Sequence, residues 1–158
     1  MNEEHSHGGN KPRVLFVCTH NSARSLMAEA LLRKHVGNAF QVFSAGTNAG
    51  QVNPMTLRVL EESGLPTRDL RSKSVAEFSG QRFDYVVTVC DQAREACPVF
   101  PGSGSTLHWS FMDPSEATGS DEERLNAFRD VFRQIEMEVA EFASTTTRAN
   151  SGEAGAQA

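Results

Sequence analysis

The sequence contains no apolar run that approaches the roughly 18 to 20 residues of a membrane-spanning helix. The opening segment MNEEHSHGGNKPR carries two acids and no apolar stretch, so it does not resemble a secretory signal. Basic residues are not in excess: 15 Lys and Arg stand against 20 Asp and Glu, which gives a net charge of −5. A general nucleic-acid binder needs a basic face. We therefore expect a cytoplasmic protein with no nucleic-acid or membrane partner, and the charge still permits a local site for one small anion.

Cysteine is also scarce. The chain has three, at positions 18, 90 and 97. Thiols are kept reduced in the cytoplasm, and a small odd number of cysteines does not indicate a structural disulfide framework. The cysteines therefore point to thiol chemistry.

The length of 158 residues predicts one domain with a core of its own. We expect a disordered arm over 1–11, a folded domain over 12–143 and a flexible tail over 144–158, because both end segments are polar and lack periodicity.

Strand-like and helix-like segments alternate along the chain. Apolar runs predict strands at 13–17, 40–45, 84–89 and 106–109. Helical patterns are found at 25–36, from Asn53-Pro54 to Gly64, at 74–78, at 91–96 and at 121–142. This order predicts an α/β fold with a central four-stranded parallel sheet flanked by helices. In such sheets, ligands bind at the carboxyl ends of the strands.

The first predicted strand runs directly into CTHNSARS, residues 18–25, and a helix follows. Backbone N–H groups at such a loop form an anion nest, and the helix dipole adds positive charge. Arg24 can hold two oxygens of a tetrahedral anion. The same field should lower the pKa of Cys18 and make it nucleophilic. Ser25 is placed to donate a hydrogen bond to the thiolate, and Asn21 to hold the loop in shape.

The whole loop is the candidate substrate site. Its members are Thr19, His20, Asn21, Ser22, Ala23, Arg24 and Ser25. We expect His20 to take the positive φ that a tight cradle needs, since His tolerates it better than most residues. The loop lacks the G-x-x-x-x-G-K pattern of ATP-binding loops. The alternative interpretation is an inert buried cysteine at a strand end.

The segment VLFVCTHNSARSLMAEALL resembles the opening of the low-molecular-weight tyrosine phosphatase fold. Phosphatases share this opening with arsenate reductases that use a thiol relay. The resemblance extends over most of residues 13–142 and implies the fold predicted above.

A second segment, VVTVCDQAREACP, resembles the redox segment of thioredoxin-coupled arsenate reductases. The resemblance implies that Cys18 attacks arsenate, that Cys90 then forms a disulfide with Cys18, and that Cys97 takes over the disulfide for thioredoxin to reduce. In a rigid helix Cys90 and Cys97 would lie about 10 Å apart, whereas a disulfide needs Cα atoms within about 7 Å. We therefore expect the segment 91–98 to unwind partly on oxidation. The alternatives are two structural cysteines, or a zinc site that includes His108.

Two further features come from the same resemblance. Asp113, in LHWSFMDPS, corresponds to the general acid that protonates the leaving oxygen, although Asp-Pro is also a common turn. Some reductases of this family bind potassium, and the matching positions here are Asn21, Glu29, Ser44 and Lys73. Lys73 falls where the potassium-binding members have aspartate, so its ammonium can take the place of the cation. We expect no potassium dependence.

The sequence thus predicts a monomeric arsenate reductase with catalytic residues Cys18, Arg24, Cys90, Cys97 and Asp113. It implies no cofactor and no metal. Phosphate and sulfate would compete with arsenate, and thioredoxin is the expected reductant. One alternative is a tyrosine phosphatase that uses Cys18, Arg24 and Asp113 and leaves the other thiols idle. Another is a non-catalytic anion sensor or redox-regulated binding protein.

Overall fold

The fold is built on four parallel strands in a computed structural model that describes residues 11–157. The strands are β1 (Arg13–Cys18), β2 (Gln41–Gly46), β3 (Tyr85–Thr88) and β4 (Ser105–His108). They lie in the order β2-β1-β3-β4, and every neighbouring pair is parallel. The predicted fold class is confirmed. The carboxyl ends of all four strands therefore meet at one edge of the sheet.

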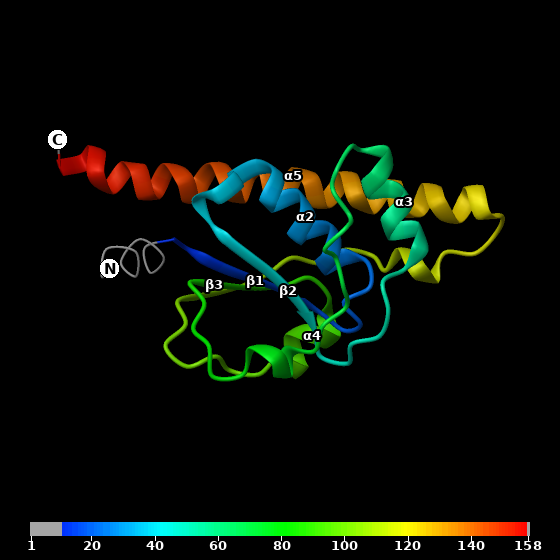
Figure 1. The fold of residues 1–158 in the computed structure, drawn as a ribbon, viewed down its shortest axis with the longest axis horizontal. Coiled ribbons are helices and arrows are strands. Elements are labelled where there is room, and N and C mark those ends of the chain that lie inside the picture. The colour runs from blue at the N-terminus through cyan, green and yellow to red at the C-terminus, as the bar shows by residue number, and fades with distance from the viewer. Residues whose placement is uncertain (1–10, 158) are drawn as a thin grey trace.

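Helices cover both faces of this sheet. They are α2 (Arg24–Val36), α3 (Pro54–Glu62), α4 (Asp91–Ala96) and α5 (Asp121–Gln157). Short 3₁₀ turns lie at Gly37–Ala39, Val75–Phe78 and Pro114–Glu116. In Figure 1, α2 and α5 lie together on one side of the sheet with α3 beside α5, and α4 lies on the other side. Crossovers of this kind are what connect parallel strands.

Aromatic rings fill the space on each side of the sheet. On the α5 side, Trp109 packs against Phe16 and Phe142 with ring centroids 5.7 Å from each. On the opposite side, Phe83 contacts Phe100 with centroids 5.3 Å apart in a T-shaped pair. Such edge-to-face pairs stabilise a core beyond the area they bury.

The last helix is longer than the sequence analysis predicts. It continues past Phe142 to Gln157. Ala143 and Thr146 are buried, and the Thr146 hydroxyl donates to the Phe142 carbonyl at 2.6 Å. The segment contains no proline to stop a helix, and these contacts extend its packed face. Of the predicted N-terminal arm, residues 1–10 lie outside the described residues.

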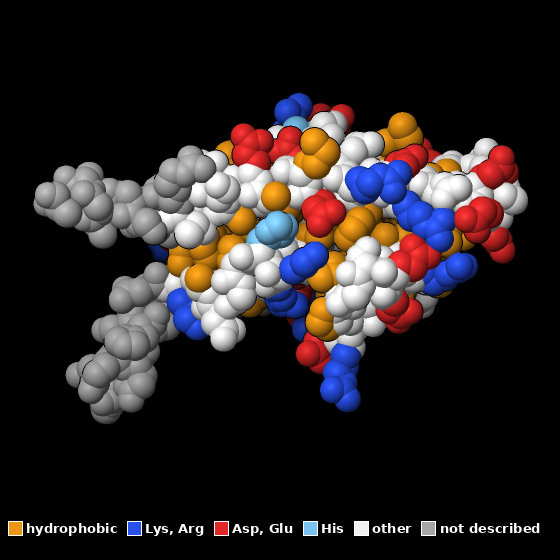
Figure 2. Space-filling model, turned by 90° about the horizontal axis from the view of Figure 1, so that it is seen from above, with side chains coloured by type: hydrophobic (Ala, Val, Ile, Leu, Met, Phe, Trp, Pro, Cys, Tyr) orange, Lys and Arg blue, Asp and Glu red, His pale blue; other side chains and the backbone are white. Residues whose placement is uncertain are grey.

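The surface over α5 carries charges of both signs. Figure 2 shows acidic and basic side chains interspersed on this face, with apolar side chains between them. Several are paired, as Arg129 is with Glu62 at 2.6 Å. No helix within the described residues is long and apolar enough to cross a membrane.

Candidate active site

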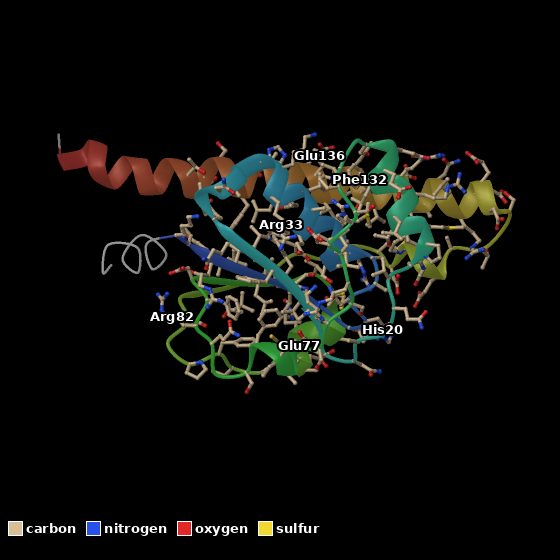
Figure 3. The ribbon with its side chains drawn as sticks, in the orientation of Figure 1. His20, Arg33, Glu77, Arg82, Phe132 and Glu136 are labelled. Atoms are coloured by element: carbon tan, nitrogen blue, oxygen red, sulfur yellow. The ribbon has the colours of Figure 1, made fainter. Side chains whose placement is uncertain are left out.

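The loop between β1 and α2 packs closely against the last residue of β2, Gly46. A Cβ atom on Gly46 would lie 2.6 Å from the Thr19 carbonyl oxygen and 2.9 Å from the Asn21 nitrogen, so only glycine allows this approach. Four loop carbonyls accept N–H bonds from the segment after β2: Cys18 from Thr47, Thr19 from Asn48, His20 from Gly50 and Ser22 from Asn53. In a planar trans peptide the N–H points opposite to the carbonyl. The N–H groups that follow these four carbonyls therefore point away from the segment after β2 and toward the interior of the loop. Figure 3 shows His20 at this end of the sheet and Arg82 at the other.

Asn21, not His20, adopts the positive φ of the loop. Its φ is 50°, and no other non-glycine residue of the described chain has a positive φ. The expectation for His20 is wrong because Asn, with a short side chain that bonds locally, tolerates this region well. The His20 ring instead lies 3.0 Å from the Asn48 carbonyl, outside the cradle.

The Cys18 thiol is buried and hydrogen-bonded on two sides. Its sulfur lies 2.7 Å from the Ser25 hydroxyl and accepts the Asn21 N–H at 3.2 Å. The Ser25 oxygen already accepts from Asn21 Nδ2 at 2.7 Å, so its own proton is free for the sulfur. Burial nevertheless raises the pKa of Cys18, and the bonds from Ser25 and Asn21 only partly offset it. The expected lowering of the pKa is therefore wrong, because desolvation of this closed position exceeds the stabilisation of the thiolate.

Behind Asn21 lies a buried polar network that contains the four residues matched to a potassium site. Asn21 Nδ2 donates to Ser44 at 3.0 Å, and Ser44 donates to Glu29 Oε1 at 2.5 Å. The Lys73 ammonium lies 3.4 Å from Ser44 Oγ and 3.8 Å from Glu29 Oε1, and it donates to the Arg71 carbonyl at 2.7 Å. Burial lowers the pKa of Lys73, and the Glu29 carboxylate opposes this shift. The ammonium thus lies among the oxygens that would otherwise surround a cation.

Arg24 and Asp113 lie together at the rim of the loop. Arg24 donates to the Phe111 carbonyl at 3.0 Å, and its Nη2 lies 3.4 Å from Asp113 Oδ2. Asp113 Oδ1 accepts from both the backbone N–H and the hydroxyl of Ser115, at 3.0 and 2.7 Å. Ser115 therefore fixes one carboxylate oxygen and leaves Oδ2 facing Arg24. Ser115 is not among the residues predicted from the sequence, although a serine two positions after Asp in Asp-Pro-Ser is typical of such a turn.

The other two cysteines lie at the two ends of α4. Cys90 is buried, and its sulfur is 3.4 Å from the Thr19 hydroxyl, beside the anion loop. The negative charge of a Cys90 thiolate would raise the pKa of Cys18 further. Cys97 is half-buried beyond the last turn, and burial raises its pKa to about 11. All three cysteines are free thiols.

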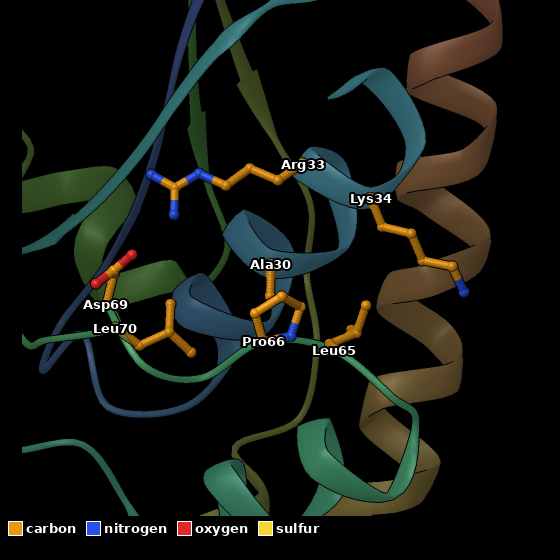
Figure 4. A pocket seen from close by; sticks show the side chains of 7 residues that line it. All are labelled: Ala30, Arg33, Lys34, Leu65, Pro66, Asp69 and Leu70. Carbon is orange, nitrogen blue, oxygen red and sulfur yellow. The ribbon is translucent and has the colours of Figure 1, made fainter. Parts of the chain in front are cut away.

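Two hollows lie near these elements. One of about 230 Å³ has Cys97, Arg94 and Thr88 in its lining. Another of about 280 Å³ lies between α2 and the segment 65–70, and none of its lining residues belongs to the anion loop (Figure 4). It is therefore separate from the candidate site.

His108 lies away from a metal-binding arrangement. Its ring bonds to Asp91 at 2.9 Å and to Thr88 at 2.7 Å. Within residues 11–157, no three His, Cys, Asp or Glu side chains are grouped as a metal site. The zinc alternative finds no support in this arrangement.

A family model described as low molecular weight phosphotyrosine protein phosphatase matches residues 13–151. The chain belongs to this family. The predicted resemblance is confirmed, and it accounts for a cysteine loop between the first strand and the first crossover helix.

Several relatives and solved structures within this family are arsenate reductases. An arsenate reductase of Halalkalibacterium halodurans is 38% identical over 136 residues, which cover 86% of this chain and 98% of the relative. A solved arsenate reductase of Archaeoglobus fulgidus has a TM-score of 0.68 at 32% identity, covering 83% of this chain and 98% of that one. The thioredoxin-dependent arsenate reductase of Corynebacterium glutamicum has a TM-score of 0.66 at 27% identity, covering 88% of this chain and 63% of that one. These relatives confirm the prediction of an enzyme of the arsenate reductase type.

Proposed function

We propose that this protein reduces arsenate to arsenite through a relay of its three cysteines. The observation that carries the proposal is their arrangement. Cys18 lies in the anion loop, Cys90 lies beside that loop at the Thr19 hydroxyl, and Cys97 lies half-buried at the far end of α4. The arsenate reductases among the relatives support this assignment.

The anion loop carries out the first step. The Cys18 thiolate attacks the arsenic atom while Arg24 and the loop N–H groups hold the remaining oxygens. Asp113 donates its proton to the leaving oxygen, which departs as water. The Ser25 hydroxyl, 2.7 Å from the sulfur, stabilises the attacking thiolate.

The relay supplies the two electrons. The Cys90 thiolate attacks the Cys18 sulfur, a Cys18–Cys90 disulfide forms, and the electron pair of the sulfur–arsenic bond leaves with arsenite. Cys97 then attacks Cys90 and releases Cys18 as a thiol. An external dithiol reduces the Cys90–Cys97 disulfide. We propose thioredoxin for this role, supported by the thioredoxin-dependent relative, and a monomeric enzyme in the cytoplasm.

Arsenate-dependent oxidation of NADPH tests this function when thioredoxin and thioredoxin reductase are supplied. The wild type should turn over continuously, and Cys97→Ser should give at most a single-turnover burst because its disulfide cannot move to the surface. Equal turnover in the two proteins would contradict the relay. Turnover with a glutaredoxin system but not with thioredoxin would contradict the choice of reductant.

A second candidate function is phosphatase activity. Cys18, Arg24 and Asp113 would serve phosphoryl transfer without the other two thiols, and the ion pair of Arg24 with Asp113 at 3.4 Å supports this candidate. Hydrolysis of p-nitrophenyl phosphate that survives Cys90→Ser and Cys97→Ser, without arsenate turnover in the wild type, would favour this function.

A further inference from the structure

Few contacts hold α4, the helix between the two relay cysteines. It has six residues, and Ala93 is its one buried side chain. Cys90 precedes its first turn and Cys97 follows its last. An isolated helix of this length is not stable in water, so it depends on tertiary contacts.

One side-chain bond ties the first turn of α4 to the sheet. Asp91 Oδ1 lies 2.9 Å from Nε2 of His108, the last residue of β4. Among the residues that the structure describes, no other side-chain hydrogen bond or ion pair joins α4 to another element. The Asp91 side chain is 74% exposed and that of His108 is 17% exposed, so the anchored partner is on the sheet.

The sheet holds the imidazole in position. His108 Nδ1 lies 2.7 Å from the hydroxyl of Thr88, its register partner on β3. When Nε2–H donates to Asp91, Nδ1 accepts the Thr88 proton. When the imidazole carries both protons, Nδ1–H donates to Thr88, whose proton can then go to the Leu107 carbonyl at 3.4 Å. The bond to Asp91 is therefore available in both protonation states.

We propose that the His108–Asp91 contact is a latch that holds α4 helical while Cys90 and Cys97 are thiols, and that it opens when their disulfide forms. This inference rests on the proposed relay. The six helical residues of α4 stand between Cys90 and Cys97. Two residues seven positions apart in a regular helix are separated by about 10 Å along its axis, whereas a disulfide needs Cα atoms within about 7 Å. The backbone after Cys90 must therefore leave the helical conformation, and Asp91 is the first residue of the helix that it would disrupt.

The latch would act on the step that transfers the disulfide from Cys18–Cys90 to Cys90–Cys97. The Cys97 thiolate attacks the Cys90 sulfur of the Cys18–Cys90 disulfide. The Cys90–Cys97 bond forms, and Cys18 leaves as a thiolate that takes up the proton lost by Cys97. No electrons enter or leave the protein. Because the latch stabilises only the helical state, it favours the Cys90–Cys97 dithiol and makes that disulfide easier for an external dithiol to reduce.

The Cys90–Cys97 disulfide equilibrium tests the latch without arsenate. In a Cys18→Ser background, the full-length protein is equilibrated in glutathione buffers, and the oxidised fraction is measured by alkylation and mass. His108→Leu and Asp91→Ala should each favour the disulfide by about threefold, the size expected for one half-exposed charged hydrogen bond. The double variant should match the larger single effect. Glu95→Ala, which removes an exposed carboxylate from the same helix, should leave the equilibrium unchanged.

Several results would overturn the latch. They are an unchanged equilibrium in Asp91→Ala, fully additive effects in the double variant, or an equal effect of Glu95→Ala. Asp91 is exposed, so its variant does not depend on repacking the sheet. Failure of the proposed function is distinguishable from failure of the latch. It would appear as absent arsenate turnover in the wild type, whatever the result of the glutathione equilibration.

Discussion

Burial raises the pKa of the Cys18 thiol, and the hydrogen bond from the Ser25 hydroxyl is the strongest of the contacts that oppose this shift. The Ser25 hydroxyl oxygen lies 2.7 Å from the Cys18 sulfur. This oxygen accepts a hydrogen bond from Asn21 Nδ2, so the hydroxyl proton of Ser25 is free to point to the sulfur. Ser25→Ala should therefore raise the pKa of Cys18 further, because the thiolate loses a hydrogen bond that stabilises its charge. The rate of alkylation by iodoacetamide near pH 7.5 should fall about tenfold in a Cys90→Ser, Cys97→Ser background. Ser22→Ala, a serine of the same loop without a bond to Cys18, is the control, and an equal loss there would contradict the assignment.

Lys73 is a buried cation whose neighbours compensate its charge. It lies 3.8 Å from Glu29 and 3.4 Å from Ser44. We expect the melting temperature and the turnover of the wild type to be the same in KCl and in NaCl at equal ionic strength. Lys73→Met should lower the free energy of unfolding by about 1–3 kcal/mol, because Glu29 then keeps only Arg33 as a charged partner. A melting temperature of the wild type that rises specifically with potassium would contradict this prediction.

Single residues were predictable where a motif carries them. Cys18 and Arg24 lie on one strand–loop–helix segment, and Arg24 lies 3.4 Å from Asp113, while the catalytic roles of the three residues remain predictions. The raised pKa of Cys18 was not predictable, since it depends on how completely the neighbouring segments exclude water. The role of Gly46 depends on a close approach to Thr19 that only the folded chain contains.

At the scale of elements, α4 ends directly before Cys97, and we expect this helix to limit access to the thiol. Burial raises the pKa of this thiol to about 11, so the folded segment holds only about 10⁻⁴ of it as thiolate at pH 7. Its reaction with a disulfide reagent should accelerate about tenfold per pH unit below that pKa, because only the thiolate reacts. Ala93→Gly weakens the helix by about 1 kcal/mol and should increase the reaction rate of Cys97 about fivefold at pH 7. Ala96→Gly, at the exposed last position of α4, should have a smaller effect. Equal rates in the two variants would show that α4 does not limit access.

The strands were predictable to within one residue at each end because they are short, apolar and bounded by turn residues. The unwinding of α4 remains a prediction. The end of α5 was not predictable from the pattern, since small residues such as Ala143 and Thr146 give no strong apolar signal. Their burial comes from contacts with the rest of the fold.

At the scale of the whole molecule, α5 covers the sheet and closes the core. Phe142 packs against Tyr85 and Trp109 with ring centroids 5.1 and 5.7 Å apart, and Thr146 is buried one turn later. A chain that ends after Ala143 should therefore be less stable than one that ends after Thr147 by about 1–2 kcal/mol, which lowers the melting temperature by roughly 2–8 °C in a domain of this size. Thr146→Ser in the longer chain separates the two causes, since it keeps the hydroxyl bond to Phe142 and removes the buried methyl group. Equal melting temperatures for the two truncated chains would show that the stably folded domain ends at Ala143, as the composition of the sequence alone predicts. A difference would show that the helix contributes to the core beyond that boundary.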